Sequence, residues 1–272
     1  ALQRAWLAIK RAGGGPGVDG TNLADFEARL PQELGRLREE LVDGRYRPRP
    51  LRQVLIPKPG GGIRPLALWA VRDRVAQRVL YDIMTPAFEP VFLPCSFGFR
   101  PGLGVGGATR RVQAHRDAGL RWIAGADIAN CFDEIPPERL LPLVARRVQH
   151  PLLLHYVRGW LEARIFNSAD GLPARAGASQ GSALSPLLAN IYLHQVDVRL
   201  TEQRWSLVRY ADDFVICCRR REQAETALAA AATALQGCGL RLSEHKSRVV
   251  HFDQGFAWLG HFFIRRECHR LS

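Results

Sequence analysis

The sequence predicts an α+β fold whose second half forms a mixed sheet. From about residue 122 the predicted elements follow the order strand, helix, hairpin, helix, strand, which is the split β-α-β-β-α-β arrangement. The chain has 272 residues, 47% of them hydrophobic, enough for one large domain or two smaller lobes with a proper core. No apolar run approaches the roughly 20 residues that cross a bilayer, and no leader pattern opens the chain, so we expect a cytoplasmic protein with no membrane partner.

The net charge of +12 predicts a polyanionic partner such as nucleic acid, although an anionic membrane surface would also attract it. One stretch concentrates this charge, with nine basic residues against a single acid, Asp73. Proline and glycine break the stretch, so it is not one amphipathic membrane helix and a phosphate-binding surface is the better interpretation. The basic residues are Arg45, Arg47, Arg49, Arg52, Lys58, Arg64, Arg72, Arg74 and Arg78.

Lysine is almost absent, because only Lys10, Lys58 and Lys246 occur among the 38 basic residues. Lysine can lose its proton where its surroundings shift its pKa, whereas arginine stays charged. Lys58 and Lys246 are therefore candidate functional residues, and the alternative is chance survival at solvated positions. The six cysteines show no C-x-x-C pair or metal-ligand spacing, which predicts reduced thiols in the core.

The first 44 residues predict a short helix, a glycine-rich break and a second helix over Leu23 to Leu41. The break reads G-G-G-P-G-V-D-G and lacks the G-K-[ST] ending of a phosphate loop, so we interpret it as a flexible turn. Next, V-L-I-P-K-P-G-G-G-I-R-P-L predicts two short strands around a turn flanked by Lys58 and Arg64. This hairpin either binds phosphate or is an ordinary exposed basic hairpin. A helix then follows from Val71 to about Thr85-Pro86.

Two loops and two helical regions complete the predicted framework around the sheet. The loop Ser96 to Gly102 either contacts a template through Arg100 or fills a corner. Residues 136–163 are helical in pattern. Ser185 followed by Pro186 predicts the start of a helix that runs to about Glu202. The small polar loop before it either lets backbone approach a ligand or simply enters the helix.

Acidic residues occur where strands of the predicted sheet end. The strand Trp122 to Ile128 contains Asp127, and the hairpin Leu207 to Cys218 carries Asp212 and Asp213 at its tip. Aspartate also favours turns, and a buried aspartate is commonly held by arginine, so neither motif alone requires a metal. The split topology, however, places the end of the Asp127 strand beside the hairpin tip. Three carboxylates beneath a basic surface suit two Mg²⁺ ions that hold a triphosphate for in-line displacement.

The remaining elements follow this hairpin. A helix is predicted over Arg221 to Leu235, and a strand over Arg248 to Phe252, with Lys246 just before it. The apolar stretch F-A-W-L-G-H-F-F then predicts a last hairpin that turns near Gly260.

The pair Y-A-D-D and, upstream, D-x-x-x-x-F resembles the reverse transcriptases of the bacterial, group II intron-like kind. The match extends from P-G-V-D-G to F-A-W-L-G. The resemblance implies an RNA-directed DNA polymerase that adds dNTPs to a primer 3′ end by two-metal catalysis. Its partners would be an RNA template and a DNA or RNA primer, and its cofactor two Mg²⁺ ions, with Mn²⁺ as an alternative.

The resemblance also assigns roles near the acids. Asp127 and Asp212 would be metal ligands, Asp213 the second acid of the signature and the Ile128 carbonyl a further ligand. Lys246 matches the lysine that protonates the leaving pyrophosphate, a role arginine would perform poorly.

Other matched positions would hold the nucleotide and the nucleic acid. Phe132 matches the aromatic gate that excludes a ribose 2′-hydroxyl, and Lys58 and Arg64 match residues that hold the triphosphate. Gln180 with Gly181 matches the loop that contacts nucleotide and template, although S-Q-G replaces the family's P-Q-G. The stretch around Trp258, Leu259 and Gly260 resembles the primer grip, and Arg100 is a candidate template contact.

By the same resemblance, residues 1–77 and 136–182 would form the fingers of a right-hand polymerase, and residues 78–135 and 183–263 its palm. Residues 264–272 would begin a missing thumb or be a linker. A truncated or separately built domain would explain the missing thumb.

The G-F-x-x-L-G ending and the R-Y-A-D-D-F-V-I-C-C-R string look most like the CRISPR-associated reverse transcriptases. These are often joined to the CRISPR integrase and acquire spacers from RNA, so that integrase is an expected partner. A group II intron maturase, another defence reverse transcriptase and a catalytically silent RNA-binding domain are the alternatives. A surface that only binds RNA would gain nothing from three acids that face phosphate, which argues against the silent domain.

Overall fold

The computed structural model describes residues 1–57, 63–166, 173–175 and 182–271, with the backbone alone described at 63–65, 164–166 and 173–175. The chain forms two compact units. The first unit contains Ala1–Pro90 and Ile135–Leu188, and the second contains Val91–Glu134 and Ala189–Ser272. Residues 78–90, 135 and 183–188, which the sequence analysis assigned to the palm, lie in the first unit.

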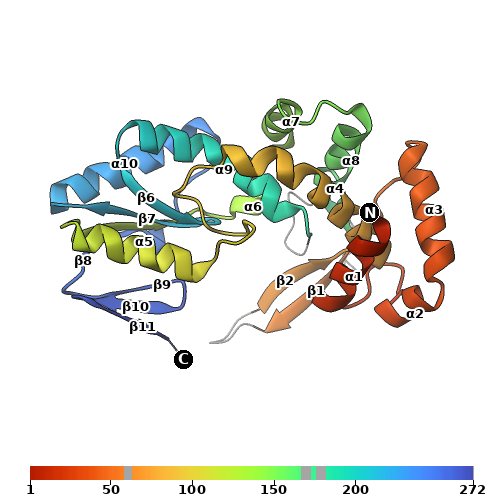
Figure 1. Cartoon of the computed structure of the whole chain (residues 1–272), viewed down its shortest axis with the longest axis horizontal. Helices are drawn as coiled ribbons and strands as arrows, with labels where there is room; N and C mark the ends of the chain where they lie inside the picture. Colours follow the sequence, from red (N-terminus) through yellow and green to blue (C-terminus); the bar gives the residue numbers. More distant parts are fainter. Residues whose placement is uncertain (58–62, 167–172, 176–181, 272) are drawn as a thin grey trace. The chain divides into compact units, whose positions relative to one another are not determined.

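Helices dominate the first unit (Figure 1). They are α1 (Leu2–Ala12), α2 (Leu23–Ala28), α3 (Leu30–Val42), α4 (Val71–Phe88), α7 (Pro137–Ala145) and α8 (Pro151–Leu161). The prediction of a single helix over Leu23 to Leu41 is wrong, because the helix is interrupted at Arg29. Pro31 explains this break, since proline lacks an N–H and fits only the first turn of a new helix. The predicted end of α4 near Thr85-Pro86 is also too early. The helix continues to Phe88, because its last turn tolerates Pro86.

The first unit contains a sheet of order β2-β1-β4-β5. Its strands are β1 (Leu51–Pro57), β2 (Ile63–Leu68), β4 (Arg164–Phe166) and β5 (Pro173–Arg175). β1 and β2 pair antiparallel with Ile56 opposite Arg64, which confirms the two predicted strands. α9 (Ser185–Glu202) starts where the sequence placed it, and the hydroxyl of Ser182 accepts the N–H groups of Leu184 and Ser185 at this start.

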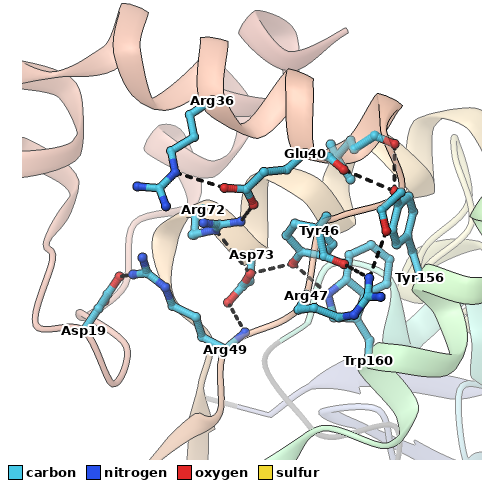
Figure 2. Close-up of polar contacts among 12 residues, drawn as sticks. Asp19, Arg36, Glu40, Tyr46, Arg47, Arg49, Arg72, Asp73, Tyr156 and Trp160 are labelled. Atoms are coloured by element: carbon cyan, nitrogen blue, oxygen red, sulfur yellow. Dashed lines mark hydrogen bonds and ion pairs between the residues drawn. The ribbon is translucent and has the colours of Figure 1, made fainter.

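A buried polar network connects the chain before β1 to α4 and α8 (Figure 2). The carboxylate of Asp73 accepts hydrogen bonds from the Tyr46 hydroxyl at 2.5 Å and from the Arg49 backbone N–H at 3.1 Å. The indole N–H of Trp160 donates to the same Tyr46 hydroxyl at 3.1 Å. Burial raises the pKa of the Asp73 carboxyl to about 6, against the lowering effect of these hydrogen bonds and of Arg72.

The raised pKa of Asp73 predicts stability that falls as pH rises. Because the folded chain holds this proton up to about pH 6 and the unfolded chain only to about pH 4, the free energy of unfolding should drop between these values by up to about 3 kcal/mol and then level off. Denaturant unfolding at several pH values measures this. Asp73→Asn should lose the drop, whereas the exposed Asp43→Asn should keep it. Parallel curves for wild type and Asp73→Asn would contradict the prediction.

The second unit contains an antiparallel sheet of order β6-β7-β3-β8 (Figure 1). Its strands are β3 (Trp122–Asp127), β6 (Ser206–Tyr210), β7 (Asp213–Cys218) and β8 (Arg248–His251). A second sheet, of order β11-β10-β9, comprises β9 (Phe256–Trp258), β10 (His261–Ile264) and β11 (Glu267–Arg270). The predicted hairpin at Gly260 is confirmed, and β11 extends it by a third strand.

Helices pack on the four-stranded sheet of the second unit. They are α5 (Val105–Asp117) and α10 (Arg221–Gly237), and the unit also contains the short α6 (Cys131–Glu134) and η2 (Glu244–Lys246), while η1 (Glu89–Val91) joins the two units along the chain. Val112 of α5, Ile123 of β3, Val215 of β7 and Phe263 of β10 belong to one buried cluster. This core holds β9–β11 against the sheet. No helix in the described ranges is both long and apolar enough to span a membrane.

Candidate active site at an acidic strand end

The register of the sheet brings two of the predicted acids face to face. Asp127 ends β3, Asp213 begins β7, and the two are direct partners in the antiparallel ladder. Opposite residues in such a ladder project from the same face. Both carboxylates line a cavity of about 270 Å³, together with Lys246 and Trp258 among other residues. The expectation that the Asp127 strand ends beside the hairpin tip is therefore met.

Asp212 lies on the turn that joins β6 to β7. The turn has two residues, Ala211 and Asp212, because Tyr210 pairs with Asp213. Ala211 has φ +57°, a left-handed conformation that is costly for a residue with a side chain. The Asp212 carbonyl accepts the N–H of Ile128 at 3.1 Å, so the turn is tied directly to the end of β3.

Burial and the neighbouring negative charges raise the pKa values of Asp212 and Asp213. Burial raises the pKa of Asp213 to about 6, and the charges of Asp127 and Asp212 add to the increase. Burial likewise raises the pKa of Asp212, with a further contribution from Asp127. Neighbouring carboxylates favour a bound cation because it removes this repulsion.

Two side chains partly neutralise this acidic end. The ammonium of Lys246 contacts Asp127 Oδ2 at 3.0 Å and remains 65% exposed, so it is accessible to a ligand. The indole N–H of Trp258 donates to Asp213 Oδ1 at 2.8 Å. Each bond engages one oxygen of its carboxylate and leaves the other for a different partner.

The donor set fits magnesium in kind, since carboxylate oxygens are the ligands that this ion prefers. Within the described ranges, however, no group of three or more His, Cys, Asp or Glu side chains is arranged as a metal site. Asp127 and Asp213 are the acids placed opposite each other, whereas the sequence assigned the leading pair to Asp127 and Asp212. Ile128, the predicted backbone ligand, is buried and forms a bridge with Leu242.

A buried arginine holds the acidic turn, and the sequence analysis missed it. Arg209 is 1% exposed, and its guanidinium binds both oxygens of Asp197 at 2.7 and 2.6 Å. It also donates to the Ala211 carbonyl in the turn and to the side chains of Asn190 and Ser96, each at 2.9 Å. The available signal was an arginine at an apolar strand position with Asp197 and Asn190 in a largely apolar helix.

The loop before α5 packs directly on this turn. The Phe97 N–H donates to the Arg209 carbonyl at 2.9 Å, and the Asn190 side chain donates to the Gly98 carbonyl at 2.8 Å. A Cβ added at Gly98 would lie 2.4 Å from the Ala211 nitrogen. Only glycine allows this close approach.

Gly98→Ala should therefore displace the acidic turn. We expect a loss of about 1–3 kcal/mol in stability, as for other overpacked sites. Thermal unfolding measures this loss. Gly106→Ala in α5 is the matched control, because its Cβ would meet only the end of the Arg110 side chain at 3.4 Å. Equal behaviour of the two variants would contradict the prediction.

The predicted nucleic-acid contacts have structural roles in this unit. Trp258 is 6% exposed, and Leu259 and Gly260 form the two-residue turn between β9 and β10, both with positive φ. The guanidinium of Arg100 donates to the carbonyls of Leu93 and Ser96, so it also stabilises its own loop. These contacts agree with the alternative that the loop fills a corner, and they do not test a template contact by Arg100.

The remaining predicted residues are placed only in part. Phe132 is the second residue of α6, five positions after Asp127, and is partly buried. Arg64 lies in β2, and its side chain is outside the described part of the chain. Lys58, Gln180 and Gly181 also lie outside the described residues.

A split sheet with carboxylates at one strand end is typical of nucleic-acid polymerases. The comparison with known families agrees with this class. Residues 56–263 match the family described as reverse transcriptase (RNA-dependent DNA polymerase), and the chain belongs to this family. Protein YkfC of Escherichia coli K12 is 34% identical over an alignment of 290 residues, which covers 92% of this chain and 76% of YkfC. The group II intron-encoded protein LtrA of Lactococcus lactis is 32% identical, over 61% of this chain and 28% of LtrA.

Solved structures show the same fold. Apo telomerase from Candida tropicalis, truncated from its C-terminal domain, has a TM-score of 0.61 at 13% identity and covers 81% of this chain and 54% of its own. Telomerase from Candida albicans, in complex with a fragment of telomeric RNA, also has a TM-score of 0.61, at 12% identity, covering 92% and 50%. The chain spans about half the length of these telomerases.

Proposed function

We propose that this chain copies RNA into DNA by adding dNTPs to a primer 3′ end. The observation that carries the proposal is the direct pairing of Asp127 with Asp213 beside Asp212, with Lys246 in contact with Asp127. The order β6-β7-β3-β8 corresponds to a split β-α-β-β-α-β sheet, and we assign this second unit as the palm and the first as the fingers.

Asp127 and Asp212, with Asp213 and the Ile128 carbonyl as further ligands, would hold two Mg²⁺ ions, which supply charge neutralisation for a triphosphate when bound. The repulsion among these carboxylates supports the assignment. Trp258 orients Asp213 by its 2.8 Å hydrogen bond. Lys246, with its exposed ammonium beside Asp127, would supply a proton to the leaving pyrophosphate oxygen.

The substrate contacts are proposed from the family resemblance. Lys58 and Arg64 on the basic hairpin would bind the triphosphate, and Gln180 with Gly181 would contact the nucleotide and the template. Trp258, Leu259 and Gly260 would support the primer, and Arg100 the template.

Primer extension tests this function. The chain is incubated with an RNA template, an annealed DNA primer, dNTPs and Mg²⁺, and the products are sized on a denaturing gel. We expect extension that depends on the RNA template and is lost when a chelator removes the metal. The Asp212→Asn variant is the negative control. Extension by both proteins, or by neither while RNA binding persists, would overturn the proposal, and the second outcome would favour a silent RNA-binding domain.

Phe132→Ala should admit ribonucleotides. If the ring excludes the 2′-hydroxyl, removing it should reduce discrimination between dNTP and rNTP by about 10- to 100-fold, the usual range for a steric contact. Single-nucleotide incorporation kinetics with dCTP and CTP measure the ratio of the two kcat/KM values. An unchanged ratio would exclude Phe132 as the gate.

We further propose that the DNA product serves CRISPR spacer acquisition from RNA, with the CRISPR integrase as partner. The R-Y-A-D-D-F-V-I-C-C-R string supports this role, whereas the similarity to LtrA supports a group II intron-like role. In cells with a CRISPR array, new spacers should derive from transcribed RNA and lose this origin with Asp212→Asn. If wild type and Asp212→Asn both gave spacers derived from RNA, the CRISPR role would be excluded and the group II intron-encoded role would be favoured.

A further inference from the structure

Four arginines from three segments of the chain line a hollow at the other end of the palm sheet. The hollow has a volume of about 890 Å³. We call it the arginine hollow, and its lining residues are Arg116, Asp117, Arg121, Phe252, Asp253, Arg265 and Arg266. Arg121 directly precedes β3, whereas Asp127 ends this strand. Six residues of strand separate the two ends by about 20 Å, so the arginine hollow is distinct from the acidic site.

Further arginines extend this charge. Arg219, Arg220 and Arg221 follow β7, whose last residue, Cys218, pairs with Trp122 at the start of β3. The guanidinium of Arg221 lies 6.0 Å from the centre of the Trp122 ring. Inside the hollow the two aspartates offset only half of the four arginine charges. The sheet therefore has an acidic end and a strongly basic end.

Arg116 is held in the hollow with unused hydrogen-bonding capacity. It is only 8% exposed, its Nε donates to Asp117 Oδ1 at 2.9 Å, and its guanidinium lies 5.9 Å from the centre of the Phe252 ring. Among the described residues its Nη1 has no hydrogen-bond acceptor. Buried guanidinium groups normally have their N–H groups satisfied, so Arg116 adds to the lining of the hollow a charged donor that the described residues leave unsatisfied.

The turn between β10 and β11 points to the same ligand. Arg265 and Arg266 form this two-residue turn, since Ile264 pairs with Glu267. Arg265 has φ +49°, a conformation that glycine adopts without cost and arginine does not. Its N–H donates to the Phe252 carbonyl at 2.8 Å, which fixes the turn beside the hollow. Turns of this length favour glycine and asparagine, yet this one presents two guanidinium groups.

We propose that the arginine hollow binds phosphate groups of a nucleic-acid strand outside the acidic site. Arginine forks match phosphate oxygens in pairs, and the hollow is large enough for more than one phosphate group. An acidic protein partner fits less well, because Phe252, the one apolar residue of the lining, is 1% exposed and offers no anchor. The site would hold template or another RNA segment while the palm acts on the primer end.

Arg265→Gly with Arg266→Ser tests the proposal, because Gly-Ser suits the turn and removes only the two charges. Arg110→Ala with Arg111→Ala removes the same charge from exposed positions of α5 and is the matched control. Fluorescence anisotropy with a labelled 20-nucleotide RNA, without dNTPs or divalent cations, measures affinity at several salt concentrations. We expect about tenfold weaker binding for the turn variant and a salt slope lower by about 1.4, as for two single-strand phosphates, with at most about a threefold change for the control.

Competition assays separate the possible sources of the anion. Unlabelled RNA should compete at low concentration, whereas inorganic phosphate and polyglutamate at equal charge should not. Unchanged affinity of the turn variant, equal losses in both variants, or effective competition by phosphate or by polyglutamate would each overturn the proposal. Because the readout is binding without synthesis, a failure of the proposed polymerase activity would leave this test intact.

Discussion

Asp212→Asn is expected to lower the rate of primer extension by at least about 10³-fold, which corresponds to about 4 kcal/mol of lost transition-state stabilisation. The amide has the same shape as the carboxyl group, and the backbone carbonyl at this position keeps its hydrogen bond to Ile128. The substitution thus removes one negative charge and little else.

Stability separates this catalytic effect from misfolding. Because burial and Asp127 raise the pKa of Asp212, the ionised form is disfavoured in the fold, and the amide removes that penalty. The thermal midpoint of Asp212→Asn should therefore be equal to or higher than that of wild type. Glu225→Gln, an equivalent change on the exposed face of α10, should affect neither property. A lower midpoint together with lost activity would contradict a catalytic role for Asp212.

Arg209→Met should destabilise the second unit by about 3–5 kcal/mol. Arg209 and Asp197 form a buried ion pair whose side chains are 2% and 0% exposed, and removing one partner leaves an uncompensated buried charge. Burial alone would lower the pKa of Arg209, and the charge of Asp197 outweighs it, so that the pKa is raised and the guanidinium stays charged. Chemical denaturation measures the loss.

A double substitution distinguishes the ion pair from the support of the turn. Arg209→Met with Asp197→Leu removes both charges, and such apolar replacements are often neutral or stabilising. Stability should therefore recover largely. Activity should not, because the double variant still lacks the 2.9 Å hydrogen bond to the Ala211 carbonyl and the turn loses its support. The remaining defect should appear in kcat rather than KM, and full recovery of kcat would show that Arg209 acts only through stability.

Much of the second unit was predictable because its signals are local. Apolar runs and the position of Asp212 and Asp213 between them define the hairpin, and the predicted strand around Asp127 agrees with β3. The errors arose where proline acts differently by position. Pro31 starts a helix and Pro86 is tolerated in a last turn, which propensity alone does not distinguish.

By itself the sequence determined the family, the order of strands and helices in the second half, and the types of residue that gather at the acidic end, because periodicity and motif spacing are properties of neighbouring residues. Tertiary structure alone decided that Asp127 faces Asp213, that Trp258 holds Asp213, and that Arg209 supports the turn. It also assembled the arginine hollow from segments far apart in the chain. These contacts depend on strand register and packing, which bring distant residues together and leave no local pattern in the sequence.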